Sequence, residues 1–396
     1  MNTMDAPAAG SAIFITDEAV FNEYCAKWQN QACIALDTEF VRTNTFYSRI
    51  GLLQIADRDA CYLIDPLEIQ DWSAFIDLLQ NPDCSFVIHS CSEDLNLLQN
   101  FLGCVPVNLF DTQIASAFIG LGFSLSYQAL VLQILDIAVA KDETRSDWLR
   151  RPLSPTQIEY AAIDVLHLLE LRDVLADRMA SKGVSDWFEL EARSRLSTAA
   201  VAEDKLGWET LYAGLSNAWR LGDQSLEYLQ KLCYWRELEA RRRNKPRNWI
   251  AKDVDLFTIA KGVEGCELFT ESALTSLVQT NEKLDRKFVS RYSGTLVKLF
   301  NGNKFTSQPI DRDLLKLPLS PRQRSKLKAC QKVVEVEAGK LSIATELLAR
   351  KKHLSELVQN FEKAELSDWP EELKGWRKQL LEPKLAAILE NDGNAN

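Results

Sequence analysis

The chain has 396 residues, of which 46% are hydrophobic and 26% charged, and its formal net charge is −10. A single hydrophobic core rarely serves a chain of this length, so we expect two or three domains. The acidic balance argues against a wholly basic nucleic-acid coat, although a local basic patch is compatible with it. With only three histidines, a histidine-built zinc enzyme or a Ser-His-Asp hydrolase is disfavoured.

The nine cysteines are scattered along the chain, and none forms a Cys-x-x-Cys pair. Their odd number and spacing favour reduced thiols in a cytoplasmic protein over a disulfide framework or a zinc site. The N-terminal residues lack a basic segment followed by an apolar one, and every apolar run is too short to span a membrane. We therefore expect no signal peptide and no membrane partner.

The first half of the chain alternates short apolar runs with amphipathic segments. The expected strands are 12–16, 34–40, 50–56, 60–66, 85–89 and 107–110. Expected helices begin near 17, 71, 90, 112 and 154, and the chain is expected to be mainly helical from about 112 to about 182. Three strands in close succession predict an antiparallel meander, and the later alternation of strands and helices predicts an α/β domain with a mixed sheet.

Residues that cap helices mark where several of these helices begin. Thr16 or Asp17 is expected to cap the first helix, and Ser90 or Ser92 the helix after strand 85–89. Ser154 is expected to cap a later helix, with proline in its first turn.

Two acids interrupt the apolar strand 34–40, namely Asp37 and Glu39. Side chains alternate along a strand, so these two point to the same face. Two carboxylates on one buried face repel each other and lose hydration, and a hard divalent cation such as Mg²⁺ or Mn²⁺ would resolve the conflict. The alternative is that they are surface acids on an edge strand.

Two further acidic signals follow on helices. Asp94 falls in the first turn of the helix after strand 85–89, where it could simply complement the helix dipole. Tyr160 and Asp164 are four residues apart and share one helix face, where they could form an ordinary surface contact. The apolar neighbours of Asp164 make a carboxylate without a partner unfavourable there.

Together these residues form a strand Asp-x-Glu, an early-helix Asp and a helical Tyr-x-x-x-Asp. In this combination the sequence resembles the DEDD 3′→5′ exonucleases of the tyrosine-bearing branch, and most closely the ribonuclease D family. The stretches Arg49-Ile-Gly-Leu-Leu-Gln-Ile and 141–153 also match, so the resemblance covers residues 12–190. It implies a ribonuclease H-like exonuclease domain over residues 1–195.

The resemblance also implies the roles of the five residues. Asp37, Glu39, Asp94 and Asp164 would bind two divalent ions, Mg²⁺ or Mn²⁺, with Asp37 bridging them. Tyr160 would position the attacking water by a hydrogen bond. The related histidine branch carries histidine one residue earlier, where this chain has Glu159.

Other residues near these motifs have weaker claims to function. Gln54 and His89 are interpreted mainly as structural hydrogen bonders, and Trp148 mainly as a core residue. Lys141 and Arg145 precede the last motif helix and could hold RNA phosphates.

The second half of the chain shows only helical periodicity from about residue 215. One segment resembles an HRDC domain, because Trp235-Arg-Glu-Leu-Glu-Ala240 leads into the loop Asn244-Lys-Pro-Arg-Asn-Trp-Ile250. We expect all-α HRDC domains at 212–292 and, in more diverged form, at 305–385. The basic run of the first could bind RNA or form a solvated helix face. Its proposed RNA-binding residues are Arg241, Arg242, Arg243, Lys245 and Arg247.

The expected function is a metal-dependent 3′→5′ exoribonuclease that releases nucleoside 5′-monophosphates. The resemblance implies structured RNA substrates, especially the 3′ ends of tRNA precursors, and a monomer is the default. One rival is an exonuclease of single-stranded DNA, because no residue pattern reports a contact with the ribose 2′-OH. Another is an RNA-binding scaffold with an inactive nuclease domain, which the complete set of acids disfavours.

Overall fold

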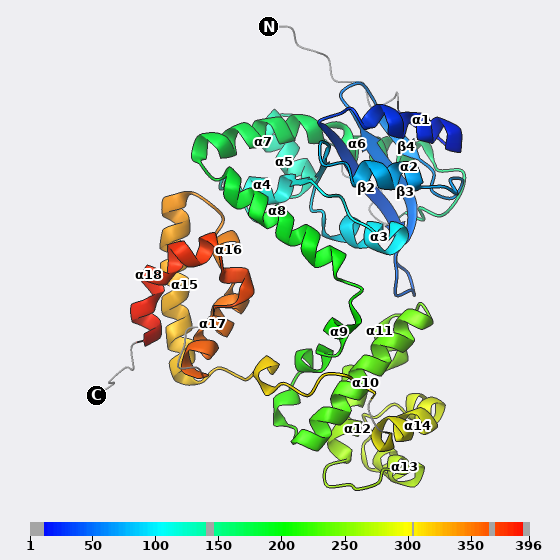
Figure 1. Cartoon of the computed structure of the whole chain (residues 1–396), viewed down its shortest axis with the longest axis vertical. Coiled ribbons are helices and arrows are strands. Elements are labelled where there is room, and N and C mark those ends of the chain that lie inside the picture. The colour runs from blue at the N-terminus through cyan, green and yellow to red at the C-terminus, as the bar shows by residue number, and fades with distance from the viewer. Residues whose placement is uncertain (1–11, 140–145, 303–304, 364–368, 391–396) are drawn as a thin grey trace. The chain divides into compact units, whose positions relative to one another are not determined.

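A computed structural model describes residues 12–139, 146–302, 305–363 and 369–390 (Figure 1). The chain divides into two compact units. Unit 1 comprises Met1–Val41, Arg49–Ala200 and Leu319–Asn396, and unit 2 comprises Arg42–Ser48 and Val201–Pro318. All nine cysteines are free thiols. No helix of the described residues is long and apolar enough to cross a membrane.

Unit 1 is built on one six-stranded mixed sheet, as predicted. The strands are β1 (Ile13–Ile15), β2 (Cys33–Val41), β3 (Arg49–Ala56), β4 (Cys61–Ile64), β5 (Ser85–Ile88) and β6 (Leu109–Asp111). Their spatial order is β1-β4-β3-β2-β5-β6. The predicted meander is confirmed, since β2, β3 and β4 pair antiparallel, while β1, β5 and β6 pair parallel with their neighbours.

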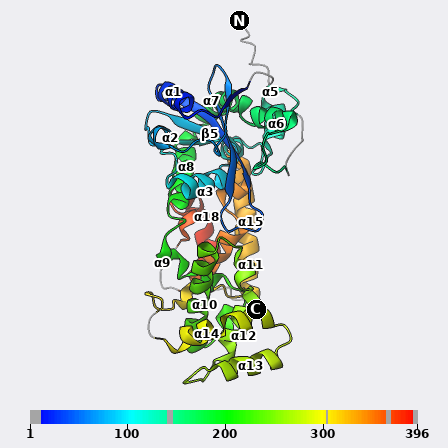
Figure 2. The same ribbon diagram turned by 90° about the vertical axis from the view of Figure 1, so that its right-hand side faces the viewer.

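Helices cover both faces of this sheet (Figures 1 and 2). One face packs against α1 (Glu18–Trp28), α2 (Ser73–Leu79) and α3 (Ser92–Leu102) through buried strand residues such as Ile34 and Leu36. The opposite face packs against α4 (Thr112–Phe118), α5 (Tyr127–Leu135), α6 (Pro155–Leu166) and α7 (Leu168–Lys182). Ala35 of β2 lies on this second face, and so do the odd-numbered residues after it.

Two of the three cap predictions are confirmed. Asp17 accepts a hydrogen bond from the Val20 N–H, and Ser154 forms a reciprocal capping box with Gln157. The prediction of Ser90 or Ser92 as the cap of α3 is wrong, because Cys91 occupies that position without a side-chain cap.

The C-terminal helices belong to the same compact unit as the sheet. They are α15 (Pro321–Leu341), α16 (Thr345–Leu348), α17 (Lys351–Lys363) and α18 (Trp376–Glu390). Within this unit they pack against α8 (Ser185–Ala200) and α4. The indole of Trp376 stacks on that of Trp187 with centroids 4.7 Å apart, and the Ala344 N–H donates to the Ala117 carbonyl at 2.9 Å.

Unit 2 is helical in its described residues, as predicted. Its helices are α9 (Lys205–Trp208), α10 (Asp223–Arg242), α11 (Arg247–Ile250), α12 (Asp253–Gly262), α13 (Glu271–Thr280) and α14 (Arg286–Asn301). They surround one apolar core, and Trp235 lies inside it with 8% of its surface exposed.

The connection between β2 and β3 packs within unit 2 and not beside the sheet that it links. Asn244 follows α10 in a left-handed conformation, with φ of 47°. Its side-chain oxygen accepts hydrogen bonds from the backbone N–H groups of Phe46 and Tyr47, each at 3.0 Å. Asparagine suits this position because it tolerates the left-handed region and supplies an acceptor.

Candidate metal-dependent active site

The centre of the sheet positions the first two acids. Asp37 and Glu39 lie on β2, between β3 and β5, so the edge-strand alternative is wrong. Both alternate with Leu36 and Thr38, and therefore face α6. A strand bordered on both sides fixes its backbone by hydrogen bonds, which gives both carboxylates a rigid base.

Helix α6 brings the third acid to the same place. Its capping box and its proline in the first turn fix the helix start, and Asp164 comes more than two turns later. Ligand oxygens of Asp37, Glu39 and Asp164 all lie within 4.8 Å of one another. In the described part of the chain, this is the only group of three His, Cys, Asp or Glu side chains that could hold a metal ion.

Asp94 approaches from α3 and is buried, with 6% of its surface exposed. Its Oδ1 accepts a hydrogen bond of 2.5 Å from the hydroxyl of Thr38. Sequence reasoning missed Thr38, although a hydroxyl between the two acids of a buried strand was a usable signal.

Asp111 fixes the turn that leads into α3. Its carboxylate accepts hydrogen bonds from the N–H groups of Ser90 and Cys91, at 3.2 and 3.0 Å. It also caps α4 by accepting from Gln113 and Ile114. These contacts with the turn before α3 explain why that helix starts without a serine cap.

The four carboxylates disfavour one another's charge. Burial, and then the charges of Asp94, Asp164 and Glu39, raise the pKa of Asp37 well above its ordinary value. Burial first, and then Asp164 and Asp94, raise the pKa of Glu39 to about 8. Burial likewise raises the pKa of Asp164 to about 7 and that of Asp94 to about 6. Without a cation, the site therefore retains protons near neutral pH.

Tyr160 lies one turn before Asp164 on the same helix and forms a hydrogen bond with it. Burial, and then the charges of Asp164 and Glu39, raise the pKa of the Tyr160 phenol. The hydroxyl therefore stays neutral at physiological pH, and it can orient a water molecule without being a base.

The donor set fits hard divalent cations. All ligand atoms are carboxylate oxygens, which Mg²⁺ and Mn²⁺ prefer. A bound cation would also relieve the repulsion that raises these pKa values. Asp37, Glu39 and Asp164 would hold such an ion, with Asp94 beside them.

Gln54 lies opposite Asp37 in the β2–β3 pairing, and on the same face. It is fully buried, and within the described structure neither its amide nitrogen nor its amide oxygen has a hydrogen-bond partner. The interpretation that it satisfies core backbone groups is therefore wrong, and its amide is available to the acidic site.

His89 and Trp148 have the structural roles that were expected. His89 Nδ1 lies 2.9 Å from the Thr112 hydroxyl, and Nε2 lies 3.1 Å from the Leu125 carbonyl. Trp148 is 2% exposed, and its Cβ and backbone lie so close to Gly51 that a side chain at position 51 would collide with them. That explains the glycine in β3.

The basic run of unit 2 is more paired than its sequence suggests. Arg241 and Arg247 both form ion pairs with Glu237, whose side chain is 1% exposed. The Arg241 guanidinium also lies 3.9 Å from the Trp208 ring centroid. Arg242 and Arg243 pair with Glu239.

Lys245, the lysine of the basic run, differs from the four arginines in its neighbours. Lys245 Nζ lies 5.8 Å from the ring centroid of Trp249, an exposed indole. No carboxylate lies within salt-bridge distance of Lys245 among the described residues. Lys141 and Arg145 lie outside the described residues.

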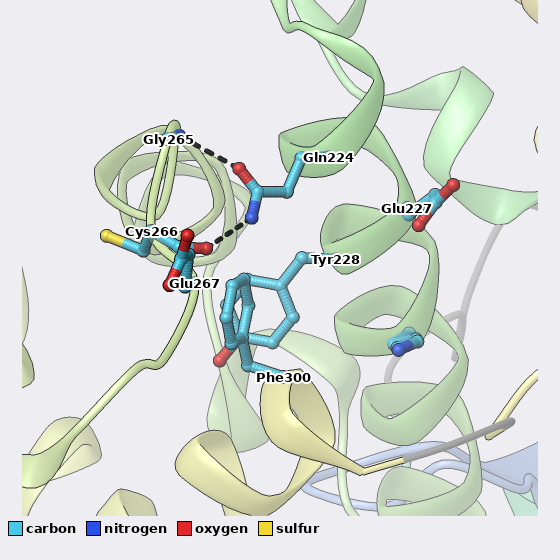
Figure 3. A pocket seen from close by; sticks show the side chains of 8 residues that line it. Gln224, Glu227, Tyr228, Gly265, Cys266, Glu267 and Phe300 are labelled. Atoms are coloured by element: carbon cyan, nitrogen blue, oxygen red, sulfur yellow. Dashed lines mark hydrogen bonds between the residues drawn. The ribbon is translucent and has the colours of Figure 1, made fainter.

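A hollow of about 390 Å³ in unit 2 offers no comparable chemistry (Figure 3). The side-chain amide of Gln224 at its edge accepts a hydrogen bond from the Gly265 N–H at 2.8 Å and donates one to the Cys266 carbonyl. Its charged lining mixes Glu227 and Glu267 with Lys231.

Comparisons with known proteins point to one family. The family model "3'-5' exonuclease" matches residues 12–180, and "Ribonuclease D, C-terminal HRDC domain" matches residues 321–385. Ribonuclease D of Pseudomonas paraeruginosa is 36% identical over 385 residues, covering 96% of this chain and 97% of that protein. Ribonuclease D of Escherichia coli is 31% identical over 379 residues, covering 95% and 98%.

Solved structures agree with these relatives. The crystal structure of Escherichia coli RNase D, described as an exoribonuclease involved in structured RNA processing, matches with a TM-score of 0.82. It is 30% identical in sequence, and the match covers 96% of this chain and 98% of that one. A protein from Bifidobacterium adolescentis shares the fold, with a TM-score of 0.59 at 19% identity.

Proposed function

Because the chain belongs to the ribonuclease D family, we propose that it matures the 3′ ends of tRNA precursors and other structured RNAs in the cytoplasm, using two divalent ions. The protein is a 3′→5′ exoribonuclease. The observation that carries the proposal is the half-buried group of Asp37, Glu39 and Asp164, with Asp94 and Tyr160 beside it.

Each of these residues has a task in phosphodiester hydrolysis. Bound cations would supply charge neutralisation and an acidified water. Asp37, Glu39, Asp94 and Asp164 would hold these cations and so would set where the terminal phosphate binds. Tyr160 orients the attacking water towards phosphorus by a hydrogen bond, while its neighbour Asp164 keeps its ring in place. The products are nucleoside 5′-monophosphates.

Changing Tyr160 to phenylalanine should slow cleavage by about 10²-fold, because the oriented water loses its hydrogen bond. Metal affinity should stay close to that of the unchanged protein, since the phenol is not a proposed ligand. Single-turnover cleavage and Mn²⁺ titration by calorimetry would measure both effects. A matched control is Tyr24→Phe, which alters a tyrosine of α1 on the other face of the sheet.

We assign RNA binding mainly to an HRDC domain at 212–292. The diverged HRDC domain at 305–385 would enlarge the RNA-binding surface. Within the basic run, Arg242, Arg243 and Lys245 are the candidates for phosphate contacts, because Arg241 and Arg247 share the buried Glu237. Lys141 and Arg145 remain proposed contacts near the scissile phosphate.

Replacing Lys245 with alanine should weaken RNA binding and lower the slope of log affinity against log salt by about 0.7, the value for one single-strand phosphate contact. Lys261→Ala, an exposed lysine of α12, is the matched control. Filter binding over a salt series would measure both slopes. An unchanged slope in Lys245→Ala would remove this residue from the interface.

The substrate is tested by three labelled strands of equal length: a tRNA precursor with a 3′ extension, an unstructured RNA and its DNA twin. The proposal expects the precursor to be shortened to its mature 3′ end and the DNA twin to persist. Equal loss of RNA and DNA would favour the DNA-exonuclease rival with relaxed sugar preference. Binding without any cleavage would favour the scaffold rival.

A further inference from the structure

A cavity of about 510 Å³ lies in unit 1, apart from the acidic group. Helices α3 and α8 form one wall, and the C-terminal residues 346–353 and 371–377 form the other. The volume falls in the range of small-molecule sites, about 300 to 1,000 Å³. It is therefore large enough for a mononucleotide or one residue of a nucleic-acid strand.

Three guanidiniums from separate elements line this cavity, those of Arg195, Arg350 and Arg377. Arg377 is a structural part of the cavity wall, since it forms an ion pair with Glu191 and donates a hydrogen bond to the Leu347 carbonyl at 2.9 Å. The Arg350 guanidinium lies over the Phe123 ring, 4.7 Å from its centroid. Stacking of this kind holds the plane of the group and leaves its N–H edge available.

Arg195 and Arg350 lack the anion that such groups usually acquire. Among the described residues, no carboxylate lies within salt-bridge distance of either guanidinium. Partial desolvation of its guanidinium, and then the charges of Arg195 and Arg377, lower the pKa of Arg350. Two uncompensated cations held at one cavity are the arrangement that a phosphate group would neutralise.

Acids also line the cavity, and most have cations of their own. Glu191 pairs with Arg377, and Glu371 pairs with Lys374 at 2.5 Å. Glu372 lies 3.7 Å from the His353 ring nitrogen. Glu346 acts on Arg350 more weakly than the two neighbouring guanidiniums do. The free charge facing the cavity from Arg195 and Arg350 is therefore positive.

The cavity lies on the outer side of α3. Ser92 and Asn96 line it, whereas Asp94 points to Thr38 of β2. Residues two apart on a helix are separated by about 200° around its axis. The cavity and the acidic group are thus on opposite sides of the same helix, and a ligand in one would not occupy the other.

We infer that this cavity is a second, phosphate-binding site, in which Arg195 and Arg350 clamp the phosphoryl group of a nucleotide. That group belongs either to a free mononucleotide, such as the product of cleavage, or to a passing RNA strand. The site does not depend on the cleavage reaction, because none of its residues is a proposed metal ligand.

Calorimetry on the full-length, metal-free protein tests this inference with AMP, adenosine and a short RNA oligomer. AMP should bind, adenosine should not, and Arg195→Gln/Arg350→Gln should lower AMP affinity by about 10-fold or more. Arg193→Gln, an exposed arginine of the same helix, should leave AMP affinity unchanged. Because Arg350 is exposed, Arg350→Gln alone provides a variant that keeps the fold.

The possible outcomes separate the sources of the phosphate. Loss of AMP affinity alone in the double variant supports a site for free nucleotides, and loss of both AMP and RNA affinity supports a site that also holds the strand. Equal affinities of the unchanged protein and the double variant for both probes would overturn the inference. AMP binding that disappears in Asp37→Asn would also overturn it, because the ligand would then lie at the acidic group.

Discussion

Replacing Asp37 with asparagine is expected to reduce cleavage of RNA by about 10³-fold or more, since metal-assisted charge stabilisation is worth several kcal/mol. Asp37 lies in the middle of the acidic group, on the central strand, and three other carboxylates act on its charge. Asparagine keeps the size of the side chain but lacks the charge that holds cations. Single-turnover cleavage of a labelled RNA measures the loss.

The same change should raise the stability of the metal-free protein near neutral pH. It removes one member of a set of mutually repelling carboxyl groups that are partly or fully buried. Asp77→Asn, an exposed aspartate of α2, serves as the control for both measurements. Cleavage at the unchanged rate by Asp37→Asn would contradict the site assignment. A loss of activity together with a lower melting temperature would instead indicate a folding defect.

The stability of the metal-free protein is expected to fall as pH rises from about 5 to about 8, the opposite of ordinary acid denaturation. Glu39 and Asp164 have folded-state pKa values of about 8 and about 7, against ordinary values of 4.5 and 3.8. Within this window the folded protein keeps protons that the unfolded chain has released. Stability therefore decreases as pH rises, and the loss is complete above the folded-state pKa values.

Calorimetry in metal-free buffer should show a melting temperature lower by about 5 °C or more at the upper end of this pH range. Mn²⁺ should reverse the loss, because it binds the ionised carboxylates of the folded state only. Glu39→Gln should flatten the dependence, while Glu68→Gln, an exposed glutamate, should not. A melting temperature that is independent of pH in the unchanged protein would contradict the electrostatics described for the site.

The acidic group could be predicted from the sequence because its signals are local. Alternation along a strand places Asp37 and Glu39 on one face, and helical spacing places Tyr160 and Asp164 together. The capping box at Ser154 depends on residues three apart. Such short-range rules do not depend on the rest of the fold.

The features that sequence analysis missed depend on residues far apart in the chain. The turn before α3 is held by Asp111, about twenty residues later, so the nearby serines are not needed as caps. Gln54 was interpreted as a structural hydrogen bonder, because its unsatisfied amide emerges only from the three-dimensional structure.

The basic run shows how a charge pattern overstates the free charge. Seven basic residues between 231 and 247 face only Glu237 and Glu239 in sequence. In the structure, these two acids form ion pairs with Arg241, Arg242, Arg243 and Arg247. Asn244 was predicted only as part of the HRDC-like motif. In the structure its side chain accepts the hydrogen bonds that fix the β2–β3 connection within unit 2.

We expect the acidic group to make 3′→5′ cleavage of RNA by this protein depend on a divalent metal ion. The most direct test of this dependence is a time course on one 5′-labelled RNA, with Mg²⁺, with Mn²⁺ and with a chelator. We expect a ladder that shortens from the 3′ end with either ion and no change with the chelator. Cleavage that continues at the same rate after complete removal of metal would contradict the account.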